Sequence, residues 1–334
     1  MSNGLSKVKI ALLGCGGMMG AHAQRLRDHP DVEIVGLCDV SEDRIQAFQA
    51  KNLPAIANVP RHFTDPAEMY EKAKPDAVVV STPHTQHFGQ GVQALAARCH
   101  VFMEKPMVTA LADAYALEQE VRKSGKIFVI GYNTSCSPEF HYLREIIRNG
   151  SLGRLELVTG FLSQDWMRGT AGLWRQEPAH SGGGQAYDSG AHLFNSLCWS
   201  VEKDVEEVFS FVDNHGTKVD INSVSSIRFA GGVMANITVS GNSPGGGRFM
   251  AFIFDGGRIE IDGWGGTWCS SCILSVLEQE VFGFVMPVPI GRLMKLGIRI
   301  DPTRLMRHNR PVAVVRESPK HTCRICDWDK NHHR

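Results

Sequence analysis

Apolar segments alternate with helical segments over residues 8–132, and this alternation constrains the fold more than any other feature of the sequence. Five apolar runs are expected to be strands, at residues 8–14, 32–39, 76–83, 100–106 and 126–132. They are rich in Val and Ile, which is typical of strands buried on both faces of a parallel sheet. Helices are expected between them, with Ser41, Asp65 and Thr109 as N-caps. This order predicts an α/β fold with a doubly wound parallel sheet.

The pattern changes after a further expected helix, which begins with Ser137 and Pro138 and ends at Gly150. Glycine-containing turns then separate six strand-like runs, at residues 154–163, 205–213, 221–230, 233–241, 248–256 and 258–263. Such turns favour antiparallel neighbours. One helical stretch, 184–200, interrupts the strands. We therefore predict a second, α+β domain with a large, mostly antiparallel sheet.

These patterns divide the chain of 334 residues into three expected parts. Residues 1–132 would form a dinucleotide-binding domain of Rossmann type, and residues 133–275 an α+β domain for substrate binding and oligomerisation. Residues 276–334 would be an atypical basic tail. From residue 287 onward this tail has eleven basic and four acidic residues and little helical periodicity, which is typical of a disordered segment.

The composition excludes several classes of partner. Lys plus Arg and Asp plus Glu each number 35, so charge gives no reason for nucleic acid or an anionic membrane to bind. No apolar run approaches the roughly 18 residues of a membrane helix, and the polar N-terminus lacks the pattern of a signal peptide. Nine cysteines lie scattered in apolar segments, as reduced thiols do. We predict a cytoplasmic protein that binds neither nucleic acid nor membranes.

The glycine cluster GCGGMMG at residues 14–20 follows the first expected strand and opens a helix, which is the context of a dinucleotide-binding turn. Gly14 and Gly16 have the spacing of the motif G-x-G-x-x-G, but Met19 stands where the third glycine is due, and Gly20 follows it. The first two glycines would make the tight turn and let backbone amides approach a pyrophosphate. The third would serve helix packing, so it is the one that can move.

Asp39 ends the second expected strand, 23 residues after Gly16, where a carboxylate would bind the ribose hydroxyls of adenosine. Val40 and Ser41 follow it, without an adjacent arginine. Since a carboxylate accepts hydrogen bonds from a free 2′-hydroxyl and repels a 2′-phosphate, we expect NAD rather than NADP. A helix-capping or turn role is the alternative for Asp39.

Three further motifs make the chain resemble the glucose–fructose oxidoreductase and myo-inositol dehydrogenase (Gfo/Idh/MocA) family, from about residue 8 to about residue 265. STPHTQH at 81–87 is similar to the T-P-x-x-x-H segment of that family, EKP at 104–106 to its signature, and GGGQAYDSGAHLFN at 182–195 to its substrate-domain motif, with LWRQEP shortly before it. The resemblance implies a NAD(H)-dependent oxidoreductase that acts on a secondary alcohol of a sugar, cyclitol or sugar derivative. It also implies a homodimer or homotetramer formed through the C-terminal sheet.

Lys105, Asp188 and His192 are the expected catalytic residues. Lys105 ends a parallel strand, so its ammonium would project into the crevice at the carboxyl edge and stabilise the developing oxyanion, with Glu104 holding it in place. Asp188 and His192 are four residues apart on one expected helix, so they would share a face, and the aspartate would fix the tautomer of the histidine that takes the alcohol proton. A solvated lysine and a surface Asp–His pair are the alternatives.

The remaining expected contacts come from the glycine turn and from the resemblance. The expected cofactor contacts are Gly14, Gly16, Gly17, Met18, Met19, Asp39, Thr82, Pro83, His87, Glu104 and Lys105. The expected substrate contacts are Lys105, Asn133, Trp166, Trp174, Arg175, Asp188 and His192. As alternatives, the tryptophans would be core residues and His87 would begin a solvated helix. Residues 134–136 depart from the arginines that many family members have after Asn133.

Two other functions fit the same motifs: a NAD-dependent glycosidase that works by transient oxidation and elimination, and a non-catalytic dinucleotide-binding sensor. A zinc site is a weaker possibility. Two C-x-x-C pairs, Cys269 with Cys272 and Cys323 with Cys326, lie in the C-terminal region, and His332 and His333 follow the second pair. The pairs are separated by about 50 residues, compared with roughly 15–20 in common zinc ribbons. We therefore predict no metal site.

Overall fold

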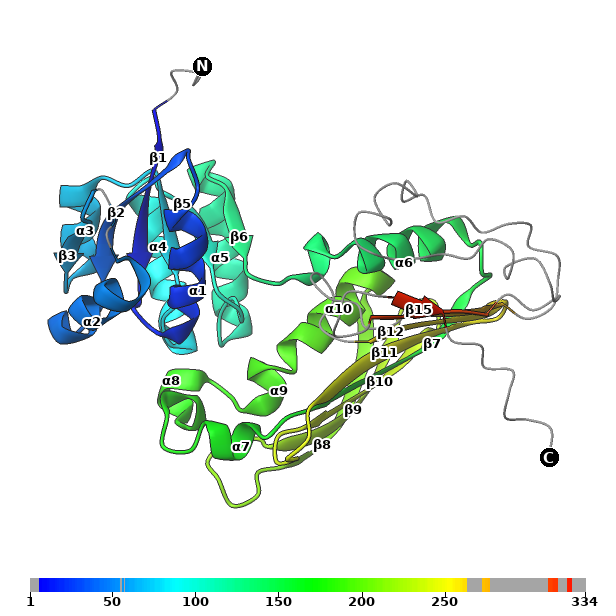
Figure 1. Ribbon diagram of the computed structural model, residues 1–334. Helices are drawn as coiled ribbons and strands as arrows, with labels where there is room; N and C mark the ends of the chain where they lie inside the picture. Colours follow the sequence, from blue (N-terminus) through cyan, green and yellow to red (C-terminus); the bar gives the residue numbers. More distant parts are fainter. Residues whose placement is uncertain are drawn as a thin grey trace. The chain divides into compact units, whose positions relative to one another are not determined.

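The computed structural model describes residues 6–54, 56, 58–262, 272–276, 312–317 and 323–325. The chain divides into two compact units, and Figure 1 labels most of their helices and strands. One unit consists of Met1–Tyr132 and Thr170–Asp188, and the other of Asn133–Gly169 and Ser189–Arg334. Residues 170–188, which the sequence pattern placed in the second domain, therefore belong to the same unit as the N-terminal sheet.

The first unit contains a six-stranded sheet in the order β3-β2-β1-β4-β5-β6, with every neighbouring pair parallel. Its strands are β1 (Val8–Leu13), β2 (Val32–Cys38), β3 (Arg61–Phe63), β4 (Ala77–Val80), β5 (His100–Met103) and β6 (Phe128–Ile130). The predicted doubly wound parallel sheet is confirmed. Strand β3 was not predicted because its residues, Arg61, His62 and Phe63, form no apolar run.

Helices cover both faces of this sheet. Helices α1 (Gly17–Arg27) and α2 (Glu42–Asn52) contribute apolar side chains to one buried cluster. Helices α3 (Pro66–Ala73), α4 (His87–Ala96) and α5 (Leu111–Ser124) contribute to a cluster on the opposite face. Alternate residues of β1 and β4 belong to the two clusters, as expected of strands buried on both sides.

Two of the three predicted N-caps of this unit are confirmed. The Ser41 hydroxyl accepts the N–H of Arg44, and the Asp65 carboxylate accepts the N–H of Ala67. The prediction of Thr109 as an N-cap is wrong, because α5 begins one residue later, after Ala110, and no side chain caps it.

The packing around the glycine turn explains why its third glycine is at position 20 rather than 19. Gly14 has φ +93°, and a Cβ there would lie 2.7 Å from the carbonyl oxygen of Ser81. The chain therefore needs glycine where the turns after β1 and β4 meet. A Cβ at Gly20 would lie 2.8 Å from Asn52 Oδ1, so this glycine makes room for α2. Met19 is fully buried in the cluster beneath α1.

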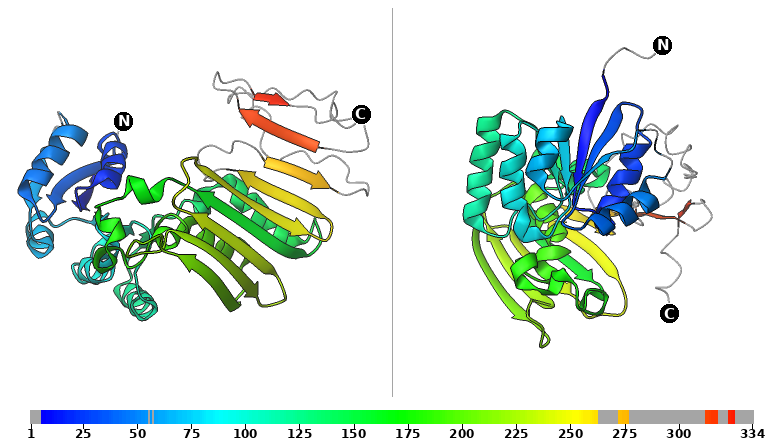
Figure 2. Two further views of the ribbon diagram at one scale, coloured as in Figure 1. Left: turned by 90° about the horizontal axis from the view of Figure 1, so that it is seen from below. Right: turned by 90° about the vertical axis from the view of Figure 1, so that its left-hand side faces the viewer.

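The second unit contains a nine-stranded sheet in the order β15-β14-β13-β12-β11-β7-β10-β9-β8, drawn as a row of arrows in the left view of Figure 2. Its strands are β7 (Leu155–Ser163), β8 (Val205–Asp213), β9 (Asn222–Phe229), β10 (Met234–Ser240), β11 (Gly247–Phe254), β12 (Gly257–Asp262), β13 (Cys272–Val276), β14 (Val312–Glu317) and β15 (Cys323–Ile325). The β10–β7 pair is parallel and the other pairs are antiparallel. The predicted mostly antiparallel sheet is confirmed. Strands β14 and β15 fall in the expected tail, whose other residues after Val276 lie outside the described ranges.

Two longer helices, α6 (Pro138–Asn149) and α10 (Ala191–Val201), pack on one face of this sheet and share its hydrophobic core. The predicted start at Ser137 and stop at Gly150 are confirmed for α6. The prediction of one helix over 184–200 is wrong. Helix α9 (Gln185–Asp188) ends, Ser189 and Gly190 form a turn, and α10 begins. No helix in the described ranges is long and apolar enough to cross a bilayer.

The glycine turn gives a stability prediction. We expect Gly14→Ala to lower the free energy of unfolding by roughly 2 kcal/mol or more, because the side chain would be strained at φ +93° and would meet Ser81. The matched control is Gly17→Ala, at the first residue of α1, where φ is not left-handed and no atom lies within 4 Å of the added Cβ. Because alanine is favoured over glycine within a helix, this change should not lower the free energy of unfolding. Urea denaturation measures both, and equal losses would contradict the assigned role of Gly14.

Candidate active site

Three loops gather at the carboxyl edge of the parallel sheet. The glycine turn follows β1, residues 81–86 with η1 (His84–Gln86) follow β4, and residues 104–106 follow β5. Ligands bind at this edge of open α/β sheets, where the strand order reverses. In this sheet the reversal lies between β1 and β4.

Side-chain hydrogen bonds hold residues 170–188 against this edge of the parallel sheet. His84 Nδ1 lies 3.0 Å from the carbonyl oxygen of Ser181. The Thr85 hydroxyl donates to the carbonyl oxygen of Ala179 at 3.0 Å. The Tyr187 hydroxyl donates to the carbonyl oxygen of Val108. These bonds hold Asp188, the last residue of the segment, beside the ends of β4 and β5.

Asp188 is the centre of the polar cluster at this edge. Lys105 Nζ donates to Asp188 Oδ1 at 2.6 Å and to its carbonyl oxygen at 3.0 Å. Arg175 Nε donates to Asp188 Oδ2 at 3.1 Å. Asp188 is only 6% exposed, and a buried carboxylate is costly unless it is paired and hydrogen-bonded. Lys105 and Asp188, which were both expected to be catalytic, are therefore in direct contact, and the carboxylate lies between two cations.

The predicted placement of Asp188 and His192 on one helix is wrong. Asp188 is the last residue of α9, and His192 is the second residue of α10 in the other unit. The turn at Ser189 and Gly190 breaks the four-residue spacing that the prediction used. The catalytic role of His192 stays a prediction.

Glu104 was expected to hold Lys105 in place, and it contacts the backbone N–H of Lys105 rather than its ammonium. Its Oε2 accepts the backbone N–H of Lys105 at 3.2 Å, and its Oε1 lies 2.7 Å from His22 Nε2. Burial raises the pKa of Glu104, but His22 and the charge of Lys105 lower it by more, so the net shift is downward. His22 lies on α1, so this contact links α1 to the end of β5.

His84 is a member of the cluster that the sequence did not indicate. Its Nε2 lies 3.9 Å from Asp188 Oδ1, and its ring packs edge-on against Trp174 with centroids 4.8 Å apart. The residue is 4% exposed, and burial lowers its pKa to about 4 despite the nearby Asp188. The imidazole is therefore neutral at pH 7. Its Nδ1–H donates to Ser181, which leaves the Nε2 lone pair on the side of Asp188.

His87 joins the loops after β4 and β5. Its Nδ1 lies 2.7 Å from the carbonyl oxygen of Pro106 and its Nε2 lies 3.0 Å from that of Thr82. Burial lowers its pKa, and a neutral ring carries one N–H, so it donates to one of the two. The residue is fully buried, which excludes a solvated helix start. Contacts of Thr82, Pro83 and His87 with the cofactor stay predictions.

The glycine turn and the start of α1 fit a dinucleotide. An added Cβ at Gly16 or Gly17 would meet no atom within 4 Å, and no side chain caps the helix. Free backbone N–H groups at such an end bind phosphate. Met18 is half exposed, whereas the buried side chain of Met19 faces the core, so Met19 could contact a cofactor only through its backbone.

Asp39 follows β2 at the carboxyl edge, where the sequence predicted a contact with the ribose of adenosine, and its carboxylate has two partners in the protein. Its Oδ2 accepts the backbone N–H of Cys15 in the glycine turn at 2.8 Å. Its Oδ1 lies 3.2 Å from Arg44 Nη1. The sequence showed no adjacent arginine, and the first turn of α2 brings Arg44 to the carboxylate. The alternative of Asp39 as a turn acid is therefore partly right, because it braces the turn.

The remaining expected substrate residues lie in the second unit. Trp166 begins the short helix α7 (Trp166–Gly169) and is 6% exposed in a small cluster with Val219 and Ile221. This packing makes it a core residue. Asn133 precedes η2 (Thr134–Cys136), where the buried Thr134 hydroxyl bonds Ser196 Oγ at 2.8 Å. Their substrate contacts stay predictions.

Within the described ranges, no group of three His, Cys, Asp or Glu residues is arranged to hold a metal ion. The predicted weak zinc candidate is not tested by this observation. Cys269, Cys326, His332 and His333 lie outside the residues that the structure describes.

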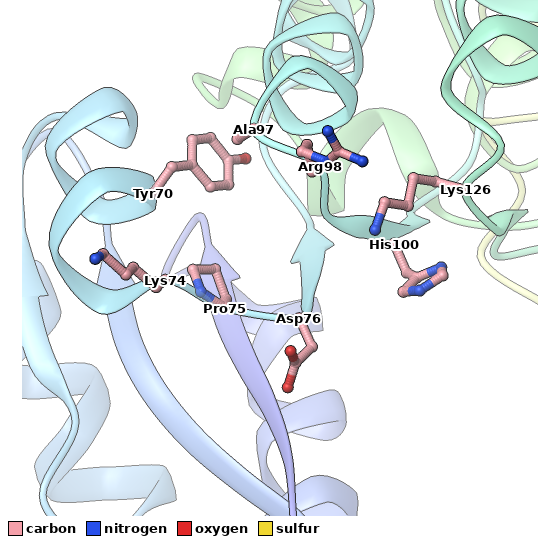
Figure 3. Close-up of a pocket in the computed structure, with 8 residues that line it drawn as sticks. All are labelled: Tyr70, Lys74, Pro75, Asp76, Ala97, Arg98, His100 and Lys126. Carbon is pink, nitrogen blue, oxygen red and sulfur yellow. The ribbon is translucent and has the colours of Figure 1, made fainter.

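A hollow of about 280 Å³ lies at the opposite, amino edge of the parallel sheet (Figure 3). Its lining includes four basic side chains, Lys74, Arg98, His100 and Lys126. Helices α3 and α4 end at this edge, and cations near helix C-termini are stabilised by the exposed carbonyl groups. Lys74, Arg98 and Lys126 follow the ends of α3, α4 and α5, and ligands in such sheets bind at the other edge. We therefore do not assign the active site to it.

Comparison with known proteins agrees with this geometry. Residues 8–132 match the family model described as "Oxidoreductase family, NAD-binding Rossmann fold", and residues 140–268 match the "GFO/IDH/MocA C-terminal domain". The chain is 28% identical over 243 residues to myo-inositol 2-dehydrogenase of Thermotoga maritima, covering 69% of this chain and 67% of that protein. It is 29% identical over 196 residues to D-glucoside 3-dehydrogenase of Escherichia coli, covering 58% of this chain and 54% of that protein.

Solved structures share the fold. The WlbA dehydrogenase from Bordetella pertussis, in complex with NADH and UDP-GlcNAcA, has a TM-score of 0.72 at 22% identity, over 82% of this chain and 79% of that one. GenD2 from gentamicin A biosynthesis, in complex with NAD, has a TM-score of 0.71 at 24% identity, over 86% of this chain and 79% of that one. At sequence identities this low, the similarity to these two structures shows a shared fold and no more.

The burial of His84 predicts a pH-dependent stability. An unfolded histidine titrates near 6.5 and folded His84 at about 4. At pH values between these two pKa values, His84 is protonated in the unfolded chain and neutral in the folded chain. The free energy of unfolding therefore falls as pH falls. We expect His84 to account for a loss of about 2 kcal/mol between about pH 7 and about pH 5. Urea denaturation at both pH values measures it.

His84→Asn keeps a donor near the Nδ1 position and should remove this part of the pH dependence. The matched control is His180→Asn, an exposed histidine of the same unit, which should keep the dependence of the unaltered protein. A slope that survives in His84→Asn would show that His84 is protonated as readily in the folded chain as in the unfolded one.

Proposed function

Because the chain belongs to the GFO/IDH/MocA family of oxidoreductases, we propose that it transfers hydride between NAD(H) and a secondary alcohol of a sugar, cyclitol or sugar derivative. The observation that carries this proposal is the Lys105–Asp188 pair at the carboxyl edge, in the same unit as a turn that fits a dinucleotide. The family model of residues 8–132 is NAD-binding. The curated relatives named above, a myo-inositol and a D-glucoside dehydrogenase, support the substrate class.

The residues that would hold the cofactor are those of the glycine turn and the end of β2. Backbone N–H groups at Gly16 and Gly17 would bind the pyrophosphate, and Asp39 would bind the ribose hydroxyls. The carboxylate of Asp39 disfavours a 2′-phosphate, so NAD is the preferred form. The bound nicotinamide supplies or accepts the hydride.

The side chains of this chain handle the oxygen and its proton. An ammonium has three N–H donors, and Lys105 uses two of its own on Asp188. The third donor would bond the substrate oxygen and stabilise the negative charge that develops there. His192 would accept the hydroxyl proton as a general base.

The proposal predicts the effect of two substitutions. Lys105→Ala and His192→Ala should each lower turnover by about 10² or more, because each removes a group that acts on the reacting hydroxyl. NAD affinity should change by no more than a few-fold. Reduced-nicotinamide absorbance measures turnover over a panel of polyols and sugars with NAD and with NADP. Lys126→Ala, a lysine at the amino edge of the same sheet, is the matched control and should keep full turnover.

Near-normal turnover in either variant would refute its assigned role. Cleavage of a glycoside without net change in nicotinamide absorbance would refute the proposed reaction. A lower KM for NADP than for NAD in the unaltered protein would refute the assigned role of Asp39.

We also propose that the chain forms a homo-oligomer through the sheet of the second unit. The face of this sheet away from α6 and α10 carries large apolar side chains that are exposed on neighbouring strands: Leu157, Phe209, Phe211, Val224, Met234 and Phe249. Three of them, Leu157, Phe209 and Met234, line a groove of about 710 Å³. An exposed apolar face of this kind marks an interaction surface, and a second copy would meet it with the same face in a two-fold dimer.

Charges on this face should separate the copies. Phe211 is 70% exposed and contacts Phe209 on β8. We expect the double substitution Phe209→Glu and Phe211→Glu to convert the oligomer into monomers at the same concentration, since burying two carboxylates in an apolar interface is unfavourable. Size-exclusion chromatography with light scattering measures the mass. Val40→Glu, an exposed position of the first unit, should leave it unchanged, and a monomeric unaltered protein would refute the proposal.

A further inference from the structure

Arg175 has contacts that differ from those of a substrate-binding arginine. Its Nε, rather than its terminal nitrogens, donates to Asp188 Oδ2 at 3.1 Å. Its guanidinium carbon lies 4.5 Å from the ring centroid of Trp174, so the ring covers one face of the group. Trp174 in turn packs against His84. The guanidinium is thus held on a fixed aromatic surface with its Nε aimed at the aspartate.

Each oxygen of the Asp188 carboxylate has its own cation. Oδ1 accepts from Lys105 and Oδ2 accepts from Arg175. Rotation of the carboxylate about its bond to Cβ would lengthen both contacts at once. The orientation of the carboxylate therefore depends on Arg175, and the position of the Lys105 ammonium depends on the carboxylate.

We propose that Arg175, supported by Trp174, is a positioning residue that fixes the Asp188 carboxylate and thereby the direction of the third N–H of Lys105. This inference rests on the proposed function, because it assigns to Arg175 an effect on the step in which Lys105 bonds the reacting oxygen. It differs from the sequence prediction that Trp174 and Arg175 contact the substrate. A positioning role changes kcat, whereas a substrate contact that is equal in the ground and transition states changes KM.

The kinetic test uses the full-length protein and Arg175→Gln. A misplaced catalytic group can cost on the order of 10²-fold in rate, so we expect kcat to fall by about 10- to 100-fold. KM for the polyol and the dissociation constant for NAD should stay within about threefold. Arg168→Gln, an exposed arginine paired with Asp165, is the matched control and should change neither parameter.

Two further variants separate positioning from loss of folding. Arg175→Gly should recover part of its kcat when guanidinium ion is added at a concentration too low to unfold the protein, since the ion can replace the missing group over Trp174. Arg175→Gln in the Lys105→Met background should lower the residual rate by less than twofold, because the residue on which it acts is absent. Additive losses in that background would overturn the proposal, as would a raised KM at unchanged kcat.

A second measurement does not depend on turnover. Urea unfolding is compared for the unaltered protein, Arg175→Gln, Asp188→Asn and the double variant. We expect Arg175→Gln to lower the midpoint in the unaltered protein and to leave it nearly unchanged in the Asp188→Asn background. The same shift in both backgrounds would show that Arg175 does not act on Asp188. If the unaltered protein transfers no hydride to any substrate of the panel, the proposed function fails, and this cycle still decides whether the contact exists.

Discussion

Two cations, Lys105 and Arg175, replace the water that the buried carboxylate of Asp188 lost on folding. Lys105 comes from the end of β5 and Arg175 from η3 (Trp174–Gln176), so the carboxylate joins residues 170–188 to the parallel sheet. The hydrogen bonds of His84, Thr85 and Tyr187 hold the same segment. The direction of the Lys105 ammonium, and with it the proposed chemistry, depends on the same three charges.

The fold was predictable wherever local pattern decides it. All five apolar runs of the first unit are strands, and Ser41 and Asp65 cap the helices that follow β2 and β3. Prediction failed over residues 184–200, where one helix was expected although two form. Ser189 and Gly190 are a local turn signal that the prediction passed over. The hydrogen bond of Asp188 to Lys105, 83 residues away, lies at the same break and could not be read from the segment itself.

The site residues that lie in sequence motifs could be predicted, and the others could not. Lys105 and Asp188 stand in recognisable motifs, and the structure brings them together. His22 lies in no motif, and His84 lies at a position that the T-P-x-x-x-H pattern does not specify. Their partners are 82 and 97 residues away in the chain. An isolated histidine gives no signal of a distant acceptor. Arg44 could have been found, since it lies one helical turn beyond the N-cap Ser41, where a side chain can reach back to Asp39 at the strand end.

The displaced glycine shows which part of the dinucleotide fingerprint is physically required. Gly14 is fixed, because its left-handed φ and its approach to the Ser81 carbonyl exclude any Cβ. The third glycine provides only room between helices, and Gly20 provides it against Asn52 just as well. Moving the glycine by one position frees Met19 to fill the core beneath α1. The turn is therefore defined by the backbone at Gly14 and by the open helix end at Gly16 and Gly17, and the register of the last glycine is set by packing.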